Sequence, residues 1–442
     1  MSEIITYGDT IMKDNKFIKS TLILIIGGMI TRLLGFVIKI IYTRTMGETG
    51  VALYTLVFPT YSLLITIASL AMPIAISKLV AEEKYRTKTI FLSSAFIMLL
   101  VNAIAIFLVM LFAPYIANVL LKNPDTYYLL VCMALTLPFI SISSILKGYY
   151  YGKQKMFPQI LSNIAEQVVR LLIIIIAMPT LMSISIKAAV AGLILLNVVS
   201  ELAQSIVLLI GLPKKVKINK EEIKPNKKIT KDVLDVSIPS VSARLIGNIG
   251  FFFEPIILTN LLLYSGYSSA YIMAEYGAYN AYAIALLTMP SFFIQAISTS
   301  VLPEISKYHA KNNKRMIKRR VLQAICICLI LGGLFSIVFS IFGSELLQVI
   351  YGTNKGSEYL KMLAPFFILF YLEGPLISTL QAIGNAQDSM KITLKGVLIK
   401  TTILAILSLC KIGMYSLVIA EIINIIYVVL ANFKKVKTLV LN

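Results

Sequence analysis

Long apolar stretches recur along the whole chain and are separated by shorter polar segments. Each stretch has the roughly 20 residues that a helix needs to cross a bilayer, where only helices or closed barrels satisfy their backbone groups. We therefore expect an all-α polytopic membrane protein with about twelve transmembrane helices. Their predicted limits are residues 17–43, 50–77, 89–113, 126–150, 158–180, 184–212, 232–263, 272–306, 321–342, 358–384, 390–410 and 412–433.

The second and eighth of these stretches are longer than a single bilayer crossing requires. Proline removes one hydrogen bond of a helix and bends it. We expect kinks at the prolines of these two stretches, which are Pro59, Pro73, Pro290 and Pro303.

The composition agrees with a membrane protein, because 58% of the 442 residues are hydrophobic and only 14% are charged. Soluble proteins carry about 25% charged residues, so a soluble enzyme, a secreted disulfide scaffold and a disordered tail are excluded. The four cysteines lie inside apolar stretches and His309 is the only histidine. Neither a metal site nor a Ser-His catalytic site is expected, and we predict a protein that is not an enzyme and has no cofactor.

Basic residues outnumber acidic residues, 41 to 21. In a membrane protein Lys and Arg gather in the cytoplasmic connections, so we expect this excess to set the topology and expect no nucleic-acid partner. The two termini and the even-numbered connections together hold 29 Lys and Arg, whereas the odd-numbered connections hold 6. This bias predicts a multi-pass protein of the cell membrane with both termini in the cytoplasm.

Three short motifs recur six spans apart. They are TRLLG at 31–35 with ARLIG at 243–247, MPIAISK at 72–78 with LPEISK at 302–307, and VVSE at 198–201 with VIAE at 418–421. Six is an even number, so the two halves share one orientation and form parallel repeats. The predicted domains are a cytoplasmic segment (1–16), an N-terminal six-helix bundle (17–212), a basic cytoplasmic linker (213–231), a C-terminal six-helix bundle (232–433) and a cytoplasmic tail (434–442).

Cationic residues inside the predicted spans are the most informative chemical feature. An Arg or Lys at the bilayer centre costs about 2.5–3.5 kcal/mol, so it is expected to face a partner or a water-filled cavity. Arg32 and Lys39 lie seven residues apart on one face of the first span, and Arg244 takes the place of Arg32 in the repeat, with Asn248 one turn further on. These four residues could line a cavity that binds a diphosphate. The alternative is that Lys39 extends to the membrane surface and Arg244 pairs with Glu254 or another acid.

The acidic residues inside the spans allow two interpretations. Glu166 and Arg170 are four residues apart and can pair on one helix. The remaining carboxyl groups within spans could form structural hydrogen bonds or serve a coupling ion. They belong to Glu201, Glu254, Glu373 and Glu421. Coupling to Na⁺, to H⁺ or to the membrane potential therefore stays open.

Two segments resemble a known family. Residues 146–158 (LKGYYYGKQKMFP) and 164–170 (IAEQVVR) resemble the stage V sporulation protein B branch of the multidrug/oligosaccharidyl-lipid/polysaccharide flippase superfamily, and residues 30–35 (ITRLLG) fit that branch and the related lipid II flippases. The three tyrosines at 149–151 suggest an aromatic belt at the membrane interface, since the chain has no Trp.

The resemblance implies two six-helix bundles that form a V around a central cavity and move lipid-linked saccharides by alternating access. It also implies that Arg32 matches the first of the arginines that hold the diphosphate in lipid II flippases. The second would fall at Ile38, which has no charge, and Lys39 is turned from it by about 100°. Many relatives have two further helices that hold the lipid tail, whereas this chain has twelve predicted spans.

The leading hypothesis is a flippase for an undecaprenyl-diphosphate-linked precursor of peptidoglycan, of the spore cortex or of a polysaccharide. Its expected partners are that substrate and membrane lipids, with cell-wall synthesis proteins as further candidates. The alternative is a cation-coupled multidrug antiporter of the same fold, which should have acidic residues along its cavity. A membrane glycosyltransferase and a non-transporting scaffold fit less well, since a transferase needs large external loops with acid and base residues.

Overall fold

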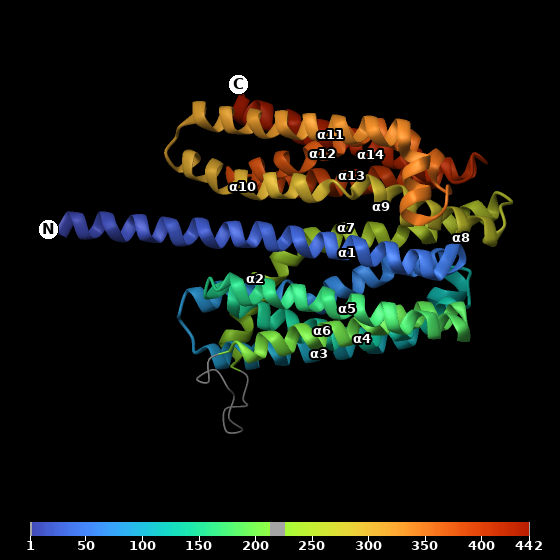
Figure 1. Ribbon diagram of the computed structural model, residues 1–442, viewed down its shortest axis with the longest axis horizontal. Helices are drawn as coiled ribbons and strands as arrows, with labels where there is room; N and C mark the ends of the chain where they lie inside the picture. The colour runs from blue at the N-terminus through green and yellow to red at the C-terminus, as the bar shows by residue number, and fades with distance from the viewer. Residues whose placement is uncertain (1, 213–225, 442) are drawn as a thin grey trace. The chain divides into compact units, whose positions relative to one another are not determined.

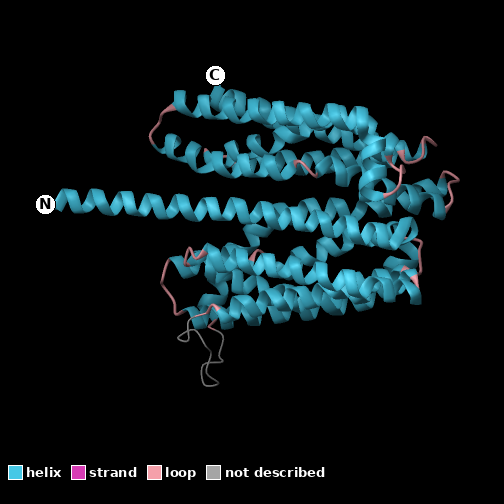
Figure 2. Ribbon diagram, in the orientation of Figure 1, coloured by secondary structure: helices cyan, strands magenta, loops and turns pink. Residues whose placement is uncertain are grey.

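The computed structural model describes residues 2–212 and 226–441 (Figure 1). Within these ranges the regular elements are helices and no strand occurs (Figure 2). The structure thus confirms the all-α class that the apolar stretches predict. Residues 213–225, which form most of the predicted basic linker, lie outside the described residues.

The described helices before the linker are α1 (Ser2–Ser69), α2 (Met72–Ala81), α3 (Thr87–Tyr115), the π-helix η1 (Ile116–Leu120), α4 (Thr126–Gly152), α5 (Met156–Ile184) and α6 (Ile186–Ile210). The described helices after it are α7 (Lys227–Tyr264), α8 (Ser269–Gly277), the π-helix η4 (Ala278–Ile284), α9 (Ala285–Thr288), α10 (Ser291–Ala310), α11 (Lys314–Tyr351), α12 (Ser357–Ala382), α13 (Ala386–Leu409), α14 (Tyr415–Val436) and the π-helix η5 (Lys437–Leu441).

The described residues contain enough apolar helix for twelve membrane crossings. Ten described helices are long and apolar enough to cross a membrane, and the bent pair Ser269–Thr288 and Ser291–Ala310 adds an eleventh. One of the ten, Ile26–Ala81, is two spans in one, because the helix is interrupted at Gly47. The chain is therefore a multi-pass membrane protein, and the count agrees with the sequence pattern.

The helix breaks follow local backbone chemistry. Gly47 adopts φ 63° and ψ −175°, a conformation that glycine tolerates and that ends one span before the next begins. Ala71, directly before the Met72–Pro73 start of α2, adopts φ 48°. The helices flanking Pro290 are bent by 48°. Pro73 and Pro290 thus mark breaks as expected, whereas Pro59 and Pro303 lie within α1 and α10.

The helices gather in two compact units. Unit 1 contains residues 1–45, 60–114 and 127–245, and unit 2 contains residues 46–59, 115–126 and 246–442. Three segments therefore pack with the half of the chain to which they do not belong by sequence: the start of α7 packs in unit 1, and residues 46–59 and 115–126 pack in unit 2.

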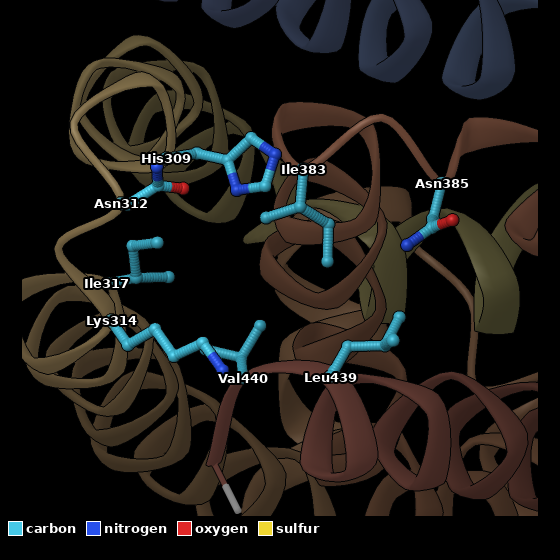
Figure 3. Close-up of a pocket in the computed structure, with 8 residues that line it drawn as sticks. All are labelled: His309, Asn312, Lys314, Ile317, Ile383, Asn385, Leu439 and Val440. Atoms are coloured by element: carbon cyan, nitrogen blue, oxygen red, sulfur yellow. The ribbon is translucent and has the colours of Figure 1, made fainter.

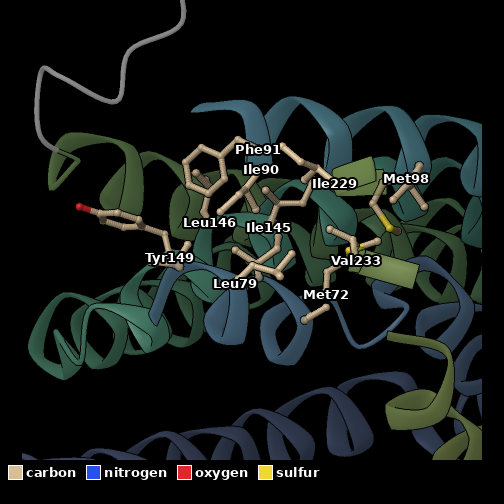
Figure 4. Close-up of a cluster of buried hydrophobic side chains, with 14 of the residues drawn as sticks. Met72, Leu79, Ile90, Phe91, Met98, Ile145, Leu146, Tyr149, Ile229 and Val233 are labelled. Atoms are coloured by element: carbon tan, nitrogen blue, oxygen red, sulfur yellow. The ribbon is translucent and has the colours of Figure 1, made fainter. Parts of the chain in front are cut away.

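The core of unit 1 joins α2, α3, α4 and the start of α7 (Figure 4). Tyr149 is only 4% exposed, Tyr150 is fully buried, and the Tyr150 hydroxyl donates a hydrogen bond of 2.5 Å to the Leu208 carbonyl in α6. The expected aromatic belt is therefore wrong for these two tyrosines. Their hydroxyls can be buried because a buried Tyr needs only a hydrogen-bond acceptor for its polar end.

Glycines on α4 allow α2 to approach closely. A Cβ added at Gly148 would lie 2.6 Å from the Ile76 Cβ, and one added at Gly152 would lie 2.7 Å from the Ser77 carbonyl oxygen. Small residues at helix contacts are the usual means of close packing in membranes, where lipid is as apolar as a leucine side chain. The repeated MPIAISK segment thus serves as the contact surface of α2.

The first turns of α7 are also fixed to unit 1 by polar contacts. Tyr85, in the connection between α2 and α3, donates a hydrogen bond of 2.7 Å to Asp232, and Lys84 lies 3.7 Å from the same carboxylate. Asp232 precedes the membrane-spanning window Arg244–Tyr264. The bond from Tyr85 lowers the pKa of Asp232 below its usual value, because a hydrogen bond to the charged form favours it.

Candidate functional site

Two of the predicted cavity cations lie on the first span of unit 1. Arg32 is exposed and Lys39 is half-buried, and neither forms an ion pair or hydrogen bond with the residues that the structure describes. The backbone leaves space one turn before Arg32, since a Cβ added at Gly28 would meet nothing within 4 Å. Ile38, where a second arginine would match the lipid II flippases, is 4% exposed and belongs to the core. Lys39 is thus the cation nearest to that position.

The other two predicted cavity residues lie on α7. Arg244 is exposed and has no ion pair within the described ranges, and Asn248 is half-buried. The alternative in which Arg244 pairs with Glu254 is wrong, because Glu254 contacts Lys400 instead. No hydrogen bond or ion pair between described residues joins Arg32 to Arg244, so their convergence on one diphosphate stays a prediction.

A polar cluster in unit 1 connects α5 to α6. Arg170 lies 2.7 Å from the Glu166 carboxylate one turn earlier and also donates to the Ser200 hydroxyl at 3.1 Å. Gln204 is fully buried and donates to the second oxygen of Glu166 at 2.6 Å. Glu166 and Arg170 therefore each have a hydrogen-bonded partner. Their ion pair on α5 also holds α6 in place, through the bonds to Ser200 and Gln204.

Glu201 differs from Glu166 because its carboxylate is not fully satisfied. Its Oε2 atom is buried and has no hydrogen-bond partner among the described residues. Lys147, Glu166 and Arg170 are the charged groups that act on it electrostatically. An unsatisfied buried carboxylate oxygen is costly, so Glu201 is less completely paired than Glu166.

The densest charge cluster of unit 2 joins Glu254 and Glu421, which the sequence analysis named, to Lys400, which it did not. The Lys400 ammonium on α13 lies 2.6 Å from Glu254 on α7 and 2.5 Å from Glu421 on α14. The Tyr276 hydroxyl donates to Glu254 at 3.1 Å. A cavity of about 120 Å³ opens beside this cluster, and Glu254, Lys400 and Asn424 are among its lining residues. Three helices are thus held together by one cation between two carboxylates.

Glu373 on α12 lies near the same cluster. Glu421 acts on it electrostatically, and Glu373 forms no hydrogen bond or ion pair with any residue in the described ranges. Within 2–212 and 226–441 no group of three or more His, Cys, Asp or Glu residues has the arrangement of a metal site.

Lys400 is the residue that sequence reasoning missed. It stands inside an apolar stretch, as Lys39 and Arg244 do, and the same argument about buried charge would have singled it out. Its partners could not be found from local spacing, because Glu254 and Glu421 come from two other helices.

Comparison with known proteins decides the family. A family model described as polysaccharide biosynthesis protein matches residues 17–309. The chain belongs to this family. A second model, MatE, matches residues 255–407. Both matches confirm the superfamily that the 146–158 and 164–170 segments suggest.

Relatives and a solved structure agree with this family. The chain is 37% identical over 407 residues to stage V sporulation protein B of Bacillus subtilis (strain 168), which covers 90% of this chain and 79% of the relative. It is 25% identical over 429 residues to lipid II flippase MurJ of the same organism, which covers 87% and 76%. An inward-facing transporter of the multidrug resistance MATE family has the same fold, with a TM-score of 0.69, 17% identity and coverage of 92% and 94%.

Proposed function

We propose that this member of the polysaccharide biosynthesis family is an alternating-access flippase of the cell membrane. Its substrate would be an undecaprenyl-diphosphate-linked saccharide, a precursor of the cell wall, of the spore cortex or of a polysaccharide. The names of two relatives, stage V sporulation protein B and lipid II flippase, support this class of substrate. No covalent bond is made or broken in such a reaction.

The observation that carries the proposal is a set of cations in membrane-spanning helices that have no anionic partner. Arg32, Lys39 and Arg244 form no ion pair with the part of the chain that the structure describes. A cation costs about 2.5–3.5 kcal/mol at the bilayer centre and less toward the interface, and a bound anion would offset that cost. A diphosphate head carries the required charge, and it loses water when it leaves the cytoplasm.

The two arginines and the lysine would have different roles. A guanidinium presents a planar set of donors that matches two phosphate oxygens at once, whereas an ammonium acts as a point charge. Arg32 and Arg244 would therefore orient the diphosphate, and Lys39 with Asn248 would add charge and a hydrogen bond. The saccharide would cross in water while the lipid tail stays in the bilayer.

The acidic residues argue against the cation-coupled antiporter. Such a transporter needs carboxylates that are free to bind an external cation. Glu166 is neutralised by Arg170, and Glu254 and Glu421 share Lys400. Glu201 and Glu373 are the acids left to serve a proton or a cation, so coupling of the flippase to H⁺, to Na⁺ or to the membrane potential, at about 2.3 kcal/mol per charge per 100 mV, belongs to this proposal.

Ligand binding distinguishes the two functions. An undecaprenyl-diphosphate saccharide should raise the melting temperature of the purified protein, since a ligand that binds only the folded state stabilises it. This rise in melting temperature should become smaller with added salt and should be absent in the Arg32→Ala, Arg244→Ala double variant. Arg86→Ala, which removes an exposed arginine from the connection between α2 and α3, is the matched control. Stabilisation by Na⁺ and lipophilic cations, with none by the lipid diphosphate, would favour the antiporter.

The topology that the proposal assumes has a separate test. Single cysteines at the exposed positions Lys311 and Ser269 lie on opposite predicted sides of the membrane. In a background without the native cysteines, an impermeant thiol reagent should label position 269 in intact cells and position 311 only after lysis. Labelling of position 311 from outside would reverse the assigned orientation.

A further inference from the structure

A second polar cavity lies in unit 2, at the end of the helices that the charge bias assigns to the cytoplasm. It has a volume of about 150 Å³ and is lined by the turn after α10, the turn after α12 and the C-terminal η5 segment. One water molecule needs about 10–15 Å³ of such space. The cavity therefore has room for a polar group of several heavy atoms.

The polar lining residues of this cavity are hydrogen-bond donors or amides. His309, Asn312, Lys314 and Asn385 surround it, and Figure 3 shows them on different sides of one space. Lys314 and His309 form no ion pair with any described residue. The side chain of Asn313, which does not line the cavity, caps α11 by accepting a hydrogen bond from the Met316 amide. The cavity thus offers donors and positive charge to a ligand that brings oxygen atoms.

The surroundings of the cavity are strongly basic. Between Glu304 and Glu345 the chain has no acidic residue, whereas residues 307–320 contain seven Lys and Arg. Two acids on the neighbouring helices α10 and α13 are paired with cations, Glu304 with Arg320 at 2.8 Å and Asp388 with Lys435 at 2.9 Å. The basic residues around the cavity would therefore attract an anionic ligand.

The other half of the lining is apolar. Ile317 is 4% exposed, and Ile383, Leu439 and Val440 complete the wall (Figure 3). A free phosphate ion gains nothing from these side chains. A ligand with a phosphate and an attached glycerol or acyl portion can use both halves of the lining.

The walls are held in place before any ligand binds. Gly384 adopts φ 84° and ends α12, with the Asn385 amide bonded to the Leu380 carbonyl at 2.8 Å. The Lys318 ammonium donates to the Leu441 carbonyl at 2.5 Å and so ties η5 to α11. A preformed site loses little conformational freedom on binding.

We propose that this cavity binds the headgroup phosphate of an anionic phospholipid from the cytoplasmic leaflet. Basic pockets between membrane helices on the cytoplasmic side are suited to such headgroups. Lys314 supplies the charge, and His309, Asn312 and Asn385 supply hydrogen bonds. This site is independent of the transported substrate, because none of its residues belongs to the predicted diphosphate cavity.

The test measures lipid adducts of the purified full-length protein by native mass spectrometry, with phosphatidylglycerol and phosphatidylcholine as probes. Phosphatidylglycerol should bind and phosphatidylcholine should not. Lys314→Gln should weaken phosphatidylglycerol binding about fivefold, the effect of one lost cationic contact. Lys311→Gln removes the same charge from the same turn but does not line the cavity, so it should change binding by less than about twofold.

A second variant tests shape without changing charge. Ile383→Trp fills the cavity and should reduce phosphatidylglycerol binding as strongly as Lys314→Gln. Equal losses in Lys314→Gln and Lys311→Gln, or normal binding in Ile383→Trp, would show a diffuse basic surface and overturn the site. Displacement of the lipid by millimolar inorganic phosphate would identify a phosphate-ion site and overturn the assignment to a lipid, as would equal binding of phosphatidylcholine.

Discussion

Replacing Lys400 with methionine tests the charge cluster of unit 2. Methionine keeps most of the apolar stem of lysine and removes the ammonium that lies 2.6 Å from Glu254 and 2.5 Å from Glu421. The side chains of Lys400, Glu421 and Glu254 are 21%, 16% and 4% exposed. The variant therefore leaves two nearly buried carboxylates without a counter-charge.

The expected cost follows from this burial. Breaking a buried ion pair by removing one partner costs about 3–5 kcal/mol, and the partial exposure of Lys400 places the estimate near the lower limit. A loss of about 3 kcal/mol lowers the melting temperature of a domain of about 150–250 residues by roughly 6–12 °C. Lys395→Met, which removes an exposed lysine from the same helix, should lower it by less than about 2 °C.

The assay is thermal unfolding of the purified protein at one fixed scan rate, followed by helical circular dichroism and by the reaction of the buried Cys328 with a thiol dye. The triple variant Glu254→Gln, Lys400→Met, Glu421→Gln has no unpaired charge in the trio and should regain most of the lost stability. The buried ion pairs do not hold these helices together if Lys400→Met and Lys395→Met have the same melting temperature. The same conclusion follows if the melting temperature of the triple variant is no higher than that of Lys400→Met.

Three further outcomes are expected. Gly148→Val should destabilise the folded protein by about 1–3 kcal/mol, because the added Cβ would collide with α2. Gly333→Ala should not destabilise it, because the Cβ there would make an ordinary contact of 3.6 Å. Equal melting temperatures of the two variants would contradict the close packing. Tyr85→Phe should lower the melting temperature at pH 7 but not at strongly acidic pH. The hydrogen bond from Tyr85 lowers the pKa of Asp232, so the bond stabilises the protein while the carboxylate is ionised and this stability is lost as the pH falls through the lowered pKa. A difference in melting temperature that does not change with pH would refute the assignment. Arg32→Lys should retain part of the transport rate, since a point charge replaces a planar fork, and full activity would argue against bidentate binding.

The membrane-spanning organisation could be predicted from the sequence because hydrophobic length is a local property. The helix α1 runs to Ser69 by hydrogen bonding, and the apolar pattern placed two spans on either side of its turn at Gly47. The bend at Pro290 followed from the missing amide hydrogen of proline. Gly47 lies in the short polar connection between the two predicted spans, so the polar residues located the turn and the glycine permits its positive φ.

Side-chain partners could be predicted only where they lie on one helix. The spacing of four between Glu166 and Arg170 led to an ion pair that the structure contains. Glu254 on α7 and Lys400 on α13 are far apart in sequence, so local spacing offered only the alternative of an Arg244–Glu254 pair, which the structure does not contain. Tyr149 and Tyr150 were assigned to the interface from composition, and tertiary packing against α2, α3 and α6 buries them instead.

The predicted diphosphate site rests neither on hydrophobic length nor on side-chain spacing within one helix. Arg32, Lys39 and Arg244 were selected because each is a cation in an apolar stretch, and the structure adds that none of them is paired with a described residue. That two of these positions are equivalent in the internal repeat gives the site its proposed symmetry. The anion that would complete it has to be found by experiment.

The most direct measurement is translocation by the purified protein in liposomes. A fluorescent undecaprenyl-diphosphate saccharide is placed in both leaflets, and a membrane-impermeant quencher reports the fraction that remains in the inner leaflet over time. The account predicts that wild-type protein and Arg86→Ala make nearly all of the fluorescence accessible, whereas Arg32→Ala, Arg244→Ala leaves the inner half protected. Equal rates in wild type and the double variant, or no translocation by the wild type, would contradict it.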